Sequence, residues 1–99
     1  QHIISPEANK DSEEIIDYFS IHNIEAGERF INEFNKKCRY LANFPNIGRS
    51  HSDVKDYLRG DSLNGYIIFY RVTDIRIEIL PVVSGYRDYQ SLFWRVINT

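Results

Sequence analysis

The hydrophobic positions in the first half of the chain predict a strand followed by two helices. His2–Ile4 is a short apolar strand. Ser5 is placed to cap a helix, and Pro6 suits the first helical position, where its missing N–H costs nothing. From Ala8 to Ile21 one face is apolar and the opposite face is acidic, as expected for a helix with one buried side. The apolar face carries Ile15, Ile16 and Phe19.

A second helical stripe follows after the pattern breaks at His22 and Asn23. Its apolar members are Phe30, Ile31, Phe34, Cys38, Leu41 and Ala42. The segment Phe44–Gly48 contains both proline and glycine and ends this helix, and the polar stretch Arg49–Lys55 predicts a loop. The first half of the chain therefore predicts an antiparallel helical hairpin behind the first strand.

The second half changes to the shorter period of strands. Three runs are rich in β-branched and aromatic residues, namely Tyr57–Arg59, Tyr66–Val72 and Ile75–Leu80. The connections Asp61–Gly65 and Thr73–Asp74 are short, which favours antiparallel pairing. Pro81 follows the last run and cannot donate to a ladder, so it indicates an edge position or a bulge.

Together these elements predict a single α+β domain over residues 1–99. It consists of an N-terminal strand, an antiparallel helical hairpin and a three-stranded antiparallel meander, with both helices packed on one sheet face. Asp88 is placed to cap a short C-terminal helical turn from Tyr89 to Phe93. The 99 residues are 42% hydrophobic and 26% charged, which is typical of one folded domain.

The single cysteine and the lack of long apolar runs indicate a cytoplasmic protein. Cys38 alone excludes an internal disulfide and a Cys-based zinc site, and it is compatible with a reducing compartment. The N-terminal residues show no secretion signal, and no apolar run approaches the roughly 18 residues of a membrane span. We therefore expect no membrane partner.

The net charge of −2 argues against nucleic acid as the main ligand, because proteins that grip a phosphate backbone usually carry a basic excess. A local basic patch stays open, because the acids are concentrated in the first third of the chain. They include Glu7, Asp11, Glu13, Glu14 and Asp17.

The residues that carry chemistry form no familiar catalytic or metal-binding motif. His2, His22 and His51 are isolated, with no second ligand three or four positions away. Cys38 lies on the apolar stripe of the second helix, where a buried neutral thiol is a poor nucleophile. Nucleotide-binding glycine loops and a nucleophile elbow are absent from the sequence, so we expect no metal and no cofactor.

Two clusters leave more than one interpretation open. Basic residues from position 49 onward could stabilise phosphate charge, or they could be solvated and paired with acids. They are Arg49, Lys55, Arg59, Arg71 and Arg87. Aromatic residues around Arg87 could pack on the helices or form a protein interface, whose composition they match. They are Tyr86, Tyr89, Phe93 and Trp94.

The order of several short motifs resembles the RelE/ParE toxin family, and in particular its ParE branch. The matching segments are 5–8 (SPEA), 14–18 (EIIDY), 41–49 (LANFPNIGR), 66–72 (YIIFYRV), 77–88 (IEILPVVSGYRD) and 92–93 (LF). They cover essentially the whole chain in order. The resemblance implies a compact toxin of a bacterial toxin–antitoxin module, neutralised by an antitoxin whose C-terminal segment wraps it.

The same resemblance separates two branches of this family. RelE-like members cleave mRNA in the ribosome with basic sheet residues and a C-terminal tyrosine, whereas ParE-like members lack that set and poison DNA gyrase. An ungapped comparison places the two sheet lysines of the ribonuclease branch at Leu58 and Gly60, and its strand arginine at Ile67. The C-terminal tyrosine of the ribonuclease branch aligns with Phe93. Of the residues compared, only an arginine is retained, as Arg87. A single arginine could provide only a small part of the rate enhancement that mRNA cleavage needs. The resemblance therefore favours a non-enzymatic gyrase inhibitor.

The ParE interpretation implies two contact surfaces. The gyrase-binding candidates are Arg87, Tyr86, Tyr89, Phe93 and Trp94. The antitoxin-binding candidates, on the helical hairpin and an exposed strand edge, are Ile15, Phe19, Phe30, Phe34, Ile79 and Val82. The implied partners are a ParD-like antitoxin and DNA gyrase, with nucleic acid reached only through those complexes.

Two alternative functions stay open at this point. The first is a ribosome-dependent mRNA endoribonuclease with a displaced catalytic set drawn from Arg49, His51, Arg59 and Arg87. The second is a relative that binds an antitoxin without being toxic.

Overall fold

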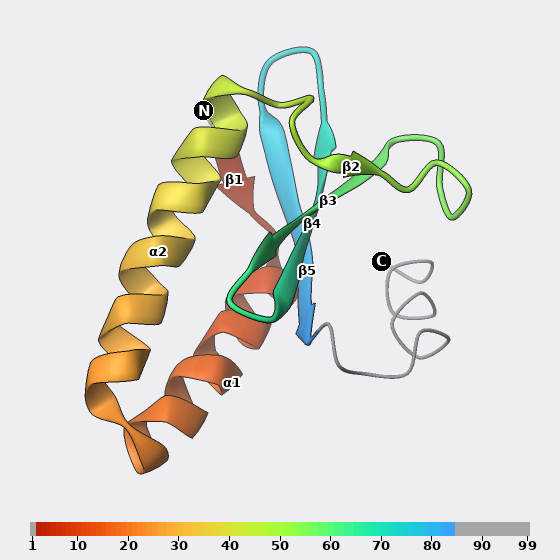
Figure 1. Cartoon of the computed structure of the whole chain (residues 1–99). Helices are drawn as coiled ribbons and strands as arrows, with labels where there is room; N and C mark the ends of the chain where they lie inside the picture. The colour runs from red at the N-terminus through yellow and green to blue at the C-terminus, as the bar shows by residue number, and fades with distance from the viewer. Residues whose placement is uncertain (1, 85–99) are drawn as a thin grey trace.

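The computed structural model describes residues 2–84, and it begins with a strand that leads directly into a helix (Figure 1). β1 spans His2–Ile4 and α1 spans Pro6–His22. Ser5 caps α1, since its Oγ accepts a hydrogen bond from Ala8 N–H at 3.1 Å, and Pro6 occupies the first turn. The predicted strand and helix start are confirmed.

A single residue, Asn23, joins the two helices. Its N–H donates to Phe19 C=O at 2.6 Å, and its Oδ1 accepts from Ala26 N–H at 3.1 Å. Asn23 therefore ends α1 and caps α2, which spans Ile24–Asn43. Gly27 allows the helices to approach closely, because a Cβ there would lie 3.0 Å from Phe19 Cβ. Neither of the helices within residues 2–84 is apolar enough over its length to cross a membrane.

Five strands form one mixed sheet in the order β1-β5-β4-β3-β2. β1 runs parallel to β5, and all other neighbouring pairs are antiparallel. The bounds of β2 to β5 are Arg49–Ser50, Leu58–Leu63, Tyr66–Val72 and Ile77–Ser84. The meander of β3, β4 and β5 is therefore flanked by a further strand on each side.

The predicted arrangement of the second half is wrong in three details. Arg49–Ser50 pairs with β3 instead of lying in a loop, and β3 continues to Leu63 through the segment expected to be a connection. β5 covers Ile77–Ser84 instead of Ile75–Leu80. The polar side chains of β2 and β3 hide the strands in the sequence, because backbone pairing near a sheet edge does not require an apolar face.

Pro81 lies in a β-bulge of β5. The pairing with β4 shifts register between Ile68 and Tyr70. Leu80 and Pro81 therefore lie together opposite Phe69, two residues against one. In a bulge, one residue does not need to donate a backbone N–H to the neighbouring strand. A strand therefore tolerates proline at this position.

The residue that follows the bulge is held by α1. Val82 N–H donates to Asp11 Oδ2 at 2.9 Å, and Asp11 is only 5% exposed. β1 pairs with β5 only as far as Ile79, so the Asp11 carboxylate supplies an acceptor that a neighbouring strand would otherwise provide. This hydrogen bond ties α1 directly to the sheet.

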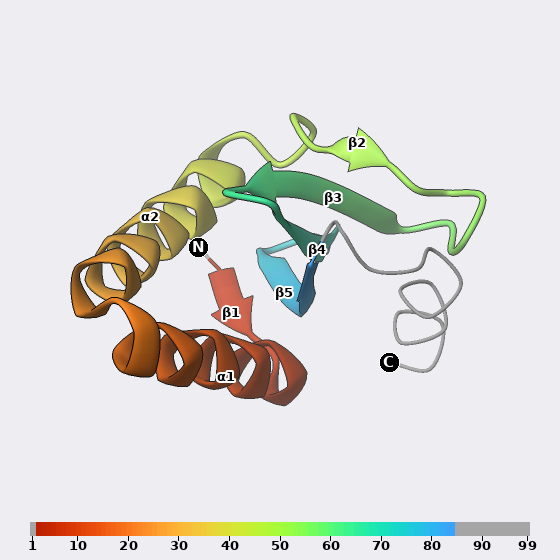
Figure 2. The ribbon, with the colours of Figure 1, turned by 60° about the horizontal axis from the view of Figure 1, so that its bottom comes forward.

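Both helices pack on one face of the sheet, as the sequence predicts (Figure 2). The buried core between helices and sheet consists of Ala8, Ile15, Phe30, Phe34, Cys38, Leu41, Leu63, Ile68, Tyr70, Ile77, Ile79 and Val82. Each large apolar side chain that is buried here contributes roughly 1.5–3 kcal/mol. This layer is therefore the main source of the domain's stability.

The opposite face of the sheet, which we call the second face, carries a smaller apolar cluster. Its buried members are Leu58, Phe69, Leu80 and Val83, with Val54 and Ile67 packed against them. The alternation of side chains along β4 explains the division, since Ile68 and Tyr70 point to the helices and their neighbours point away.

Candidate functional site

The second face is bordered at β2 by a polar hollow of about 360 Å³, which we call the β2–β3 hollow. Its lining residues are Ile47, Arg49, His51, Gly60, Asp61, Ser62 and Ile67. Arg49 reaches this hollow because it pairs with Gly60 across the β2–β3 ladder. Two of the residues that the sequence analysis considered for phosphate chemistry, Arg49 and His51, therefore meet at one place.

His51 is positioned by the sheet beneath it. A Cβ at Gly60 would lie 3.2 Å from His51 Nε2, so glycine makes room for the ring. The ring meets Phe69 edge-on with centroids 5.3 Å apart. Burial lowers the pKa of the His51 imidazole, the Arg49 charge lowers it further, and Asp53 partly opposes both.

Arg59 lies apart from this hollow. Its guanidinium donates to Gly48 C=O at 2.7 Å and to Asn46 C=O at 3.2 Å, where it secures the loop between α2 and β2. The alternative catalytic set is therefore divided, because Arg49 and His51 share the hollow and Arg59 serves a structural loop. The fourth member, Arg87, lies outside the described residues.

Two further members of the basic set, Arg71 and Lys55, are engaged with neighbours. Arg71 forms an ion pair with Glu78 at 2.8 Å across β4 and β5. Its guanidinium also lies over the Tyr57 ring at 5.3 Å, and Lys55 lies 5.8 Å from the same ring. These contacts give Arg71 and Lys55 a structural role in packing the protein surface.

The six antitoxin-binding candidates all face the interior of the domain. Ile15, Phe30, Phe34, Ile79 and Val82 are at most 8% exposed, and Phe19 is partly buried against them. They form the core between helices and sheet and present no open surface to a partner in this structure. The periodic stripe identifies the side of a helix that packs, and here it packs on the chain's own sheet.

The helical hairpin instead exposes a different apolar set at its tip, on both sides of Asn23. Tyr18, Ile21 and Ile24 are 56%, 81% and 65% exposed. Sequence reasoning missed these three because they fall outside the buried stripe. Their signal was the presence of large apolar residues around a predicted helix break, where polar residues are usual.

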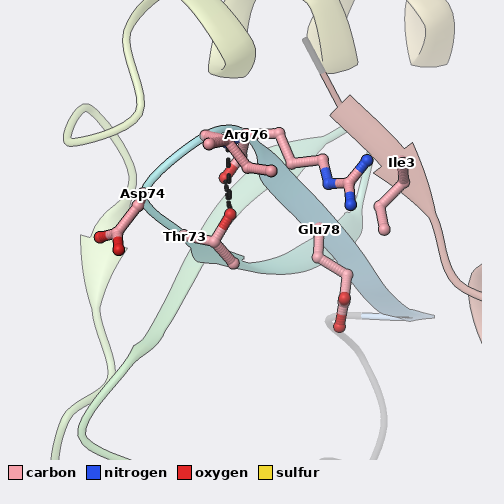
Figure 3. Close-up of a pocket in the computed structure, with 6 residues that line it drawn as sticks. Ile3, Thr73, Asp74, Arg76 and Glu78 are labelled. Atoms are coloured by element: carbon pink, nitrogen blue, oxygen red, sulfur yellow. Dashed lines mark hydrogen bonds between the residues drawn. The ribbon is translucent and has the colours of Figure 1, made fainter.

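A second hollow, of about 400 Å³, lies where β1 meets the turn between β4 and β5 (Figure 3). Its lining residues are Ile3, Thr73, Asp74, Ile75, Arg76 and Glu78. The sequence gives no sign that β1 lies beside this turn, because the parallel pairing of β1 with β5 brings together residues more than 70 positions apart.

Neither the thiol nor the histidines make a metal or nucleophile site within residues 2–84. Burial raises the pKa of the Cys38 thiol to about 12, so it stays a neutral core side chain. No three His, Cys, Asp or Glu side chains in this part of the chain gather as ligands for one ion. The five gyrase-binding candidates, Tyr86, Arg87, Tyr89, Phe93 and Trp94, and the predicted helical turn Tyr89–Phe93 lie outside the described residues.

Comparison with known proteins places this fold and its motifs in a family. A family model described as the ParE toxin of the type II toxin–antitoxin system parDE matches residues 3–89. No curated protein matches the chain. The match covers β1 from Ile3, both helices, β2 to β5 and residues 85–89. The chain therefore belongs to the ParE toxin family, within the RelE/ParE superfamily, and is a toxin of a type II toxin–antitoxin system.

Proposed function

We propose that this toxin acts in the cytoplasm by binding DNA gyrase and stopping its cycle without catalysing a reaction itself, and that a ParD-like antitoxin neutralises it. The observation that carries the proposal is the chemistry of the second face. Leu58, Gly60 and Ile67 stand where the resemblance places the cations of ribonuclease relatives. Leu58 is buried, Ile67 packs against the same cluster, and Gly60 lies beneath the His51 ring. Without cations at these three positions the second face lacks most of the charge that would stabilise phosphodiester cleavage, which favours inhibition by binding.

The antitoxin contact is supported by the exposed tip of the helical hairpin. Tyr18, Ile21 and Ile24 are large, exposed apolar side chains close together in sequence, and exposed apolar patches often mark sites of protein interaction. An amphipathic antitoxin segment laid on this tip would remove that surface from solvent. Ile21→Asp, set beside the exposed polar control Asn32→Asp, should weaken binding of the antitoxin encoded next to this toxin. Equal affinities of the two variants would refute this contact.

Purified gyrase tests the target directly. With relaxed plasmid and ATP, added toxin should abolish supercoiling or accumulate cleaved DNA. Arg87→Ala should require about tenfold more toxin for the same effect, as truncation of an interface hot spot does, whereas Arg29→Ala on the exposed side of α2 should act like the wild type. Unchanged supercoiling at a large excess of toxin would sink the proposal.

A ribosome-dependent ribonuclease stays the second candidate, because Arg49 and His51 line one hollow. A translation extract with a defined mRNA separates the two functions. The gyrase proposal expects intact message, whereas codon-specific cuts that disappear in His51→Ala would favour the ribonuclease. Wild-type growth on induction of the toxin would instead favour the third candidate, a relative that binds its antitoxin without toxicity.

A further inference from the structure

Among residues 2–84, β1 is an edge strand, paired on one side only. Ser5 N–H donates to Ile79 C=O at 2.9 Å, which fixes the alternation of the parallel ladder. Ser5 and Ile3 therefore direct their backbone groups to β5, and His2 and Ile4 direct theirs outward. Within residues 2–84, no strand lies on that outer side.

The turn between β4 and β5 stands beside this edge in a fixed conformation. Thr73 N–H and Thr73 Oγ1 both donate to Arg76 C=O at 2.8 Å, and Arg76 N–H donates to Thr73 Oγ1 at 3.2 Å. This closed turn holds Ile75 76% exposed, and Ile3 on β1 is 39% exposed. Two aliphatic side chains therefore line one hollow at the sheet edge, and Figure 3 shows Ile3 on its β1 side.

Arg76 brings a positive charge to the same hollow. Its guanidinium extends toward Ile3, whereas the Asp74 carboxylate points away from it on the other side of the turn (Figure 3). The Glu78 carboxylate is engaged by Arg71 at 2.8 Å. Arg76 itself forms no ion pair within residues 2–84. The hollow thus combines aliphatic walls with a guanidinium, a pairing that selects a carboxylate carried next to an aliphatic side chain.

We infer that this notch, formed by Ile3, Ile75 and Arg76 beside β1, docks an extended segment of the cognate antitoxin. The inference rests on the proposed neutralisation by an antitoxin and adds the chemistry of one contact. The segment adds a strand to the outer side of β1 through the backbone groups of His2 and Ile4. An Asp or Glu of the segment pairs with Arg76, and a neighbouring aliphatic side chain covers Ile3 and Ile75. Charge complementarity at Arg76 favours this acidic segment over a basic one.

Two synthetic peptides test the notch on the folded toxin. Both alternate valine and threonine over ten residues, and they differ only in a central Glu or Gln. Titration followed by ¹H–¹⁵N spectra should shift the amides of His2 and Ile4 and the side-chain N–H of Arg76. The Glu peptide should bind about two- to fivefold more tightly, as expected for one exposed ion pair. No shift at millimolar peptide, or equal affinities of the two peptides, would overturn the inference.

Charge variants of the toxin locate the contact. Arg76→Glu should remove the preference for the Glu peptide, whereas the exposed control Arg29→Glu on α2 should keep it. Loss of the preference in both variants, or in neither, contradicts the notch. Sedimentation of the toxin alone must show a monomer, because a dimer that protects the His2 and Ile4 amides would assign the edge to a second copy. The gyrase assay is independent of the peptide test. If the toxin does not inhibit gyrase but still prefers the Glu peptide, only the proposed target is refuted.

Discussion

Tyr70 shows how one hydroxyl group fixes a loop that contains no regular structure. Its Oη donates to Pro45 C=O at 2.7 Å and accepts from Gly48 N–H at 3.0 Å. Tyr70→Phe keeps the buried ring and leaves both backbone groups without this partner. We expect the free energy of unfolding to fall by about 1–3 kcal/mol, measured by urea denaturation. A change below about 0.5 kcal/mol would show that water replaces the hydroxyl.

Gly48 is required by the same contact. A Cβ at this position would lie 2.4 Å from Tyr70 Oη and 3.0 Å from Gly60 C=O. Gly48→Ala should therefore destabilise the domain by about 1–3 kcal/mol through overpacking. In the Tyr70→Phe background the same change should cost less, because the nearest atom is gone. A double-mutant cycle of urea midpoints measures this coupling, and strict additivity of the two changes would contradict the contact.

Asp11 is the one buried acid of α1 and serves the sheet, although it belongs to the acidic run noted in the sequence. Its bond to Val82 N–H is lost in Asp11→Ala, which leaves a buried donor behind. We expect a loss of about 1–3 kcal/mol in unfolding free energy. Asp11→Asn keeps an acceptor and should lose less. Asp17→Ala, exposed on the same helix, is the control and should stay within about 0.5 kcal/mol.

At the scale of elements, the turn between β3 and β4 fixes the register of that hairpin. Asn64 and Gly65 both have positive φ, at 49° and 85°, as a two-residue hairpin loop requires. Gly65→Ala places a Cβ in this left-handed conformation and should cost about 1–2 kcal/mol. Thermal or urea unfolding checks the value, with the exposed Ser62→Ala as control. An unchanged midpoint for Gly65→Ala would mean that the turn adopts another conformation at no cost.

The same turn explains a wrong strand boundary. Asn64-Gly65 carried the hairpin signal in the sequence, but the polar residues Asp61 and Ser62 made the connection look longer than two residues. Asp61 is polar because it pairs with Lys37 of α2 at 3.1 Å, and that contact is visible only when helix and sheet are packed.

At the scale of the whole molecule, we expect the stability of the domain to depend on histidine protonation. Burial lowers the pKa of His51 and of His2 in the folded state below the usual 6.5. The unfolded chain therefore binds protons more readily, so their contribution to stability is complete above about pH 6.5 and is lost as the pH falls through the folded-state values.

Unfolding free energy measured from pH 7.5 to 5 should decrease for the wild type, before most carboxylates titrate. The double variant His2→Gln, His51→Gln should show a flatter profile over this range. Parallel profiles of the two proteins would mean that other groups control the pH dependence.

The two hollows also belong to this scale, because each one combines segments that are distant in sequence. The β2–β3 hollow joins Arg49 and His51 to Ile67, and the notch joins Ile3 to the turn at Ile75. The sequence identified Arg49 and His51 as candidate chemistry, but it gave no indication that Arg59 would be occupied by the carbonyls of Asn46 and Gly48.

By itself, the sequence determined the elements that depend on local patterns, and its motifs carried the family resemblance. The helices, the capping by Ser5, the strand Tyr66–Val72 and the irregularity at Pro81 follow from spacing, capping and backbone chemistry within a few residues. Tertiary structure alone decided which apolar side chains are core and which are surface. Apolar periodicity identifies the face of a helix that becomes buried. It does not reveal whether that face packs on the chain's own sheet or on a partner protein. For Phe30 and Phe34 it is the sheet, and for Ile21 and Ile24 the structure leaves the surface open.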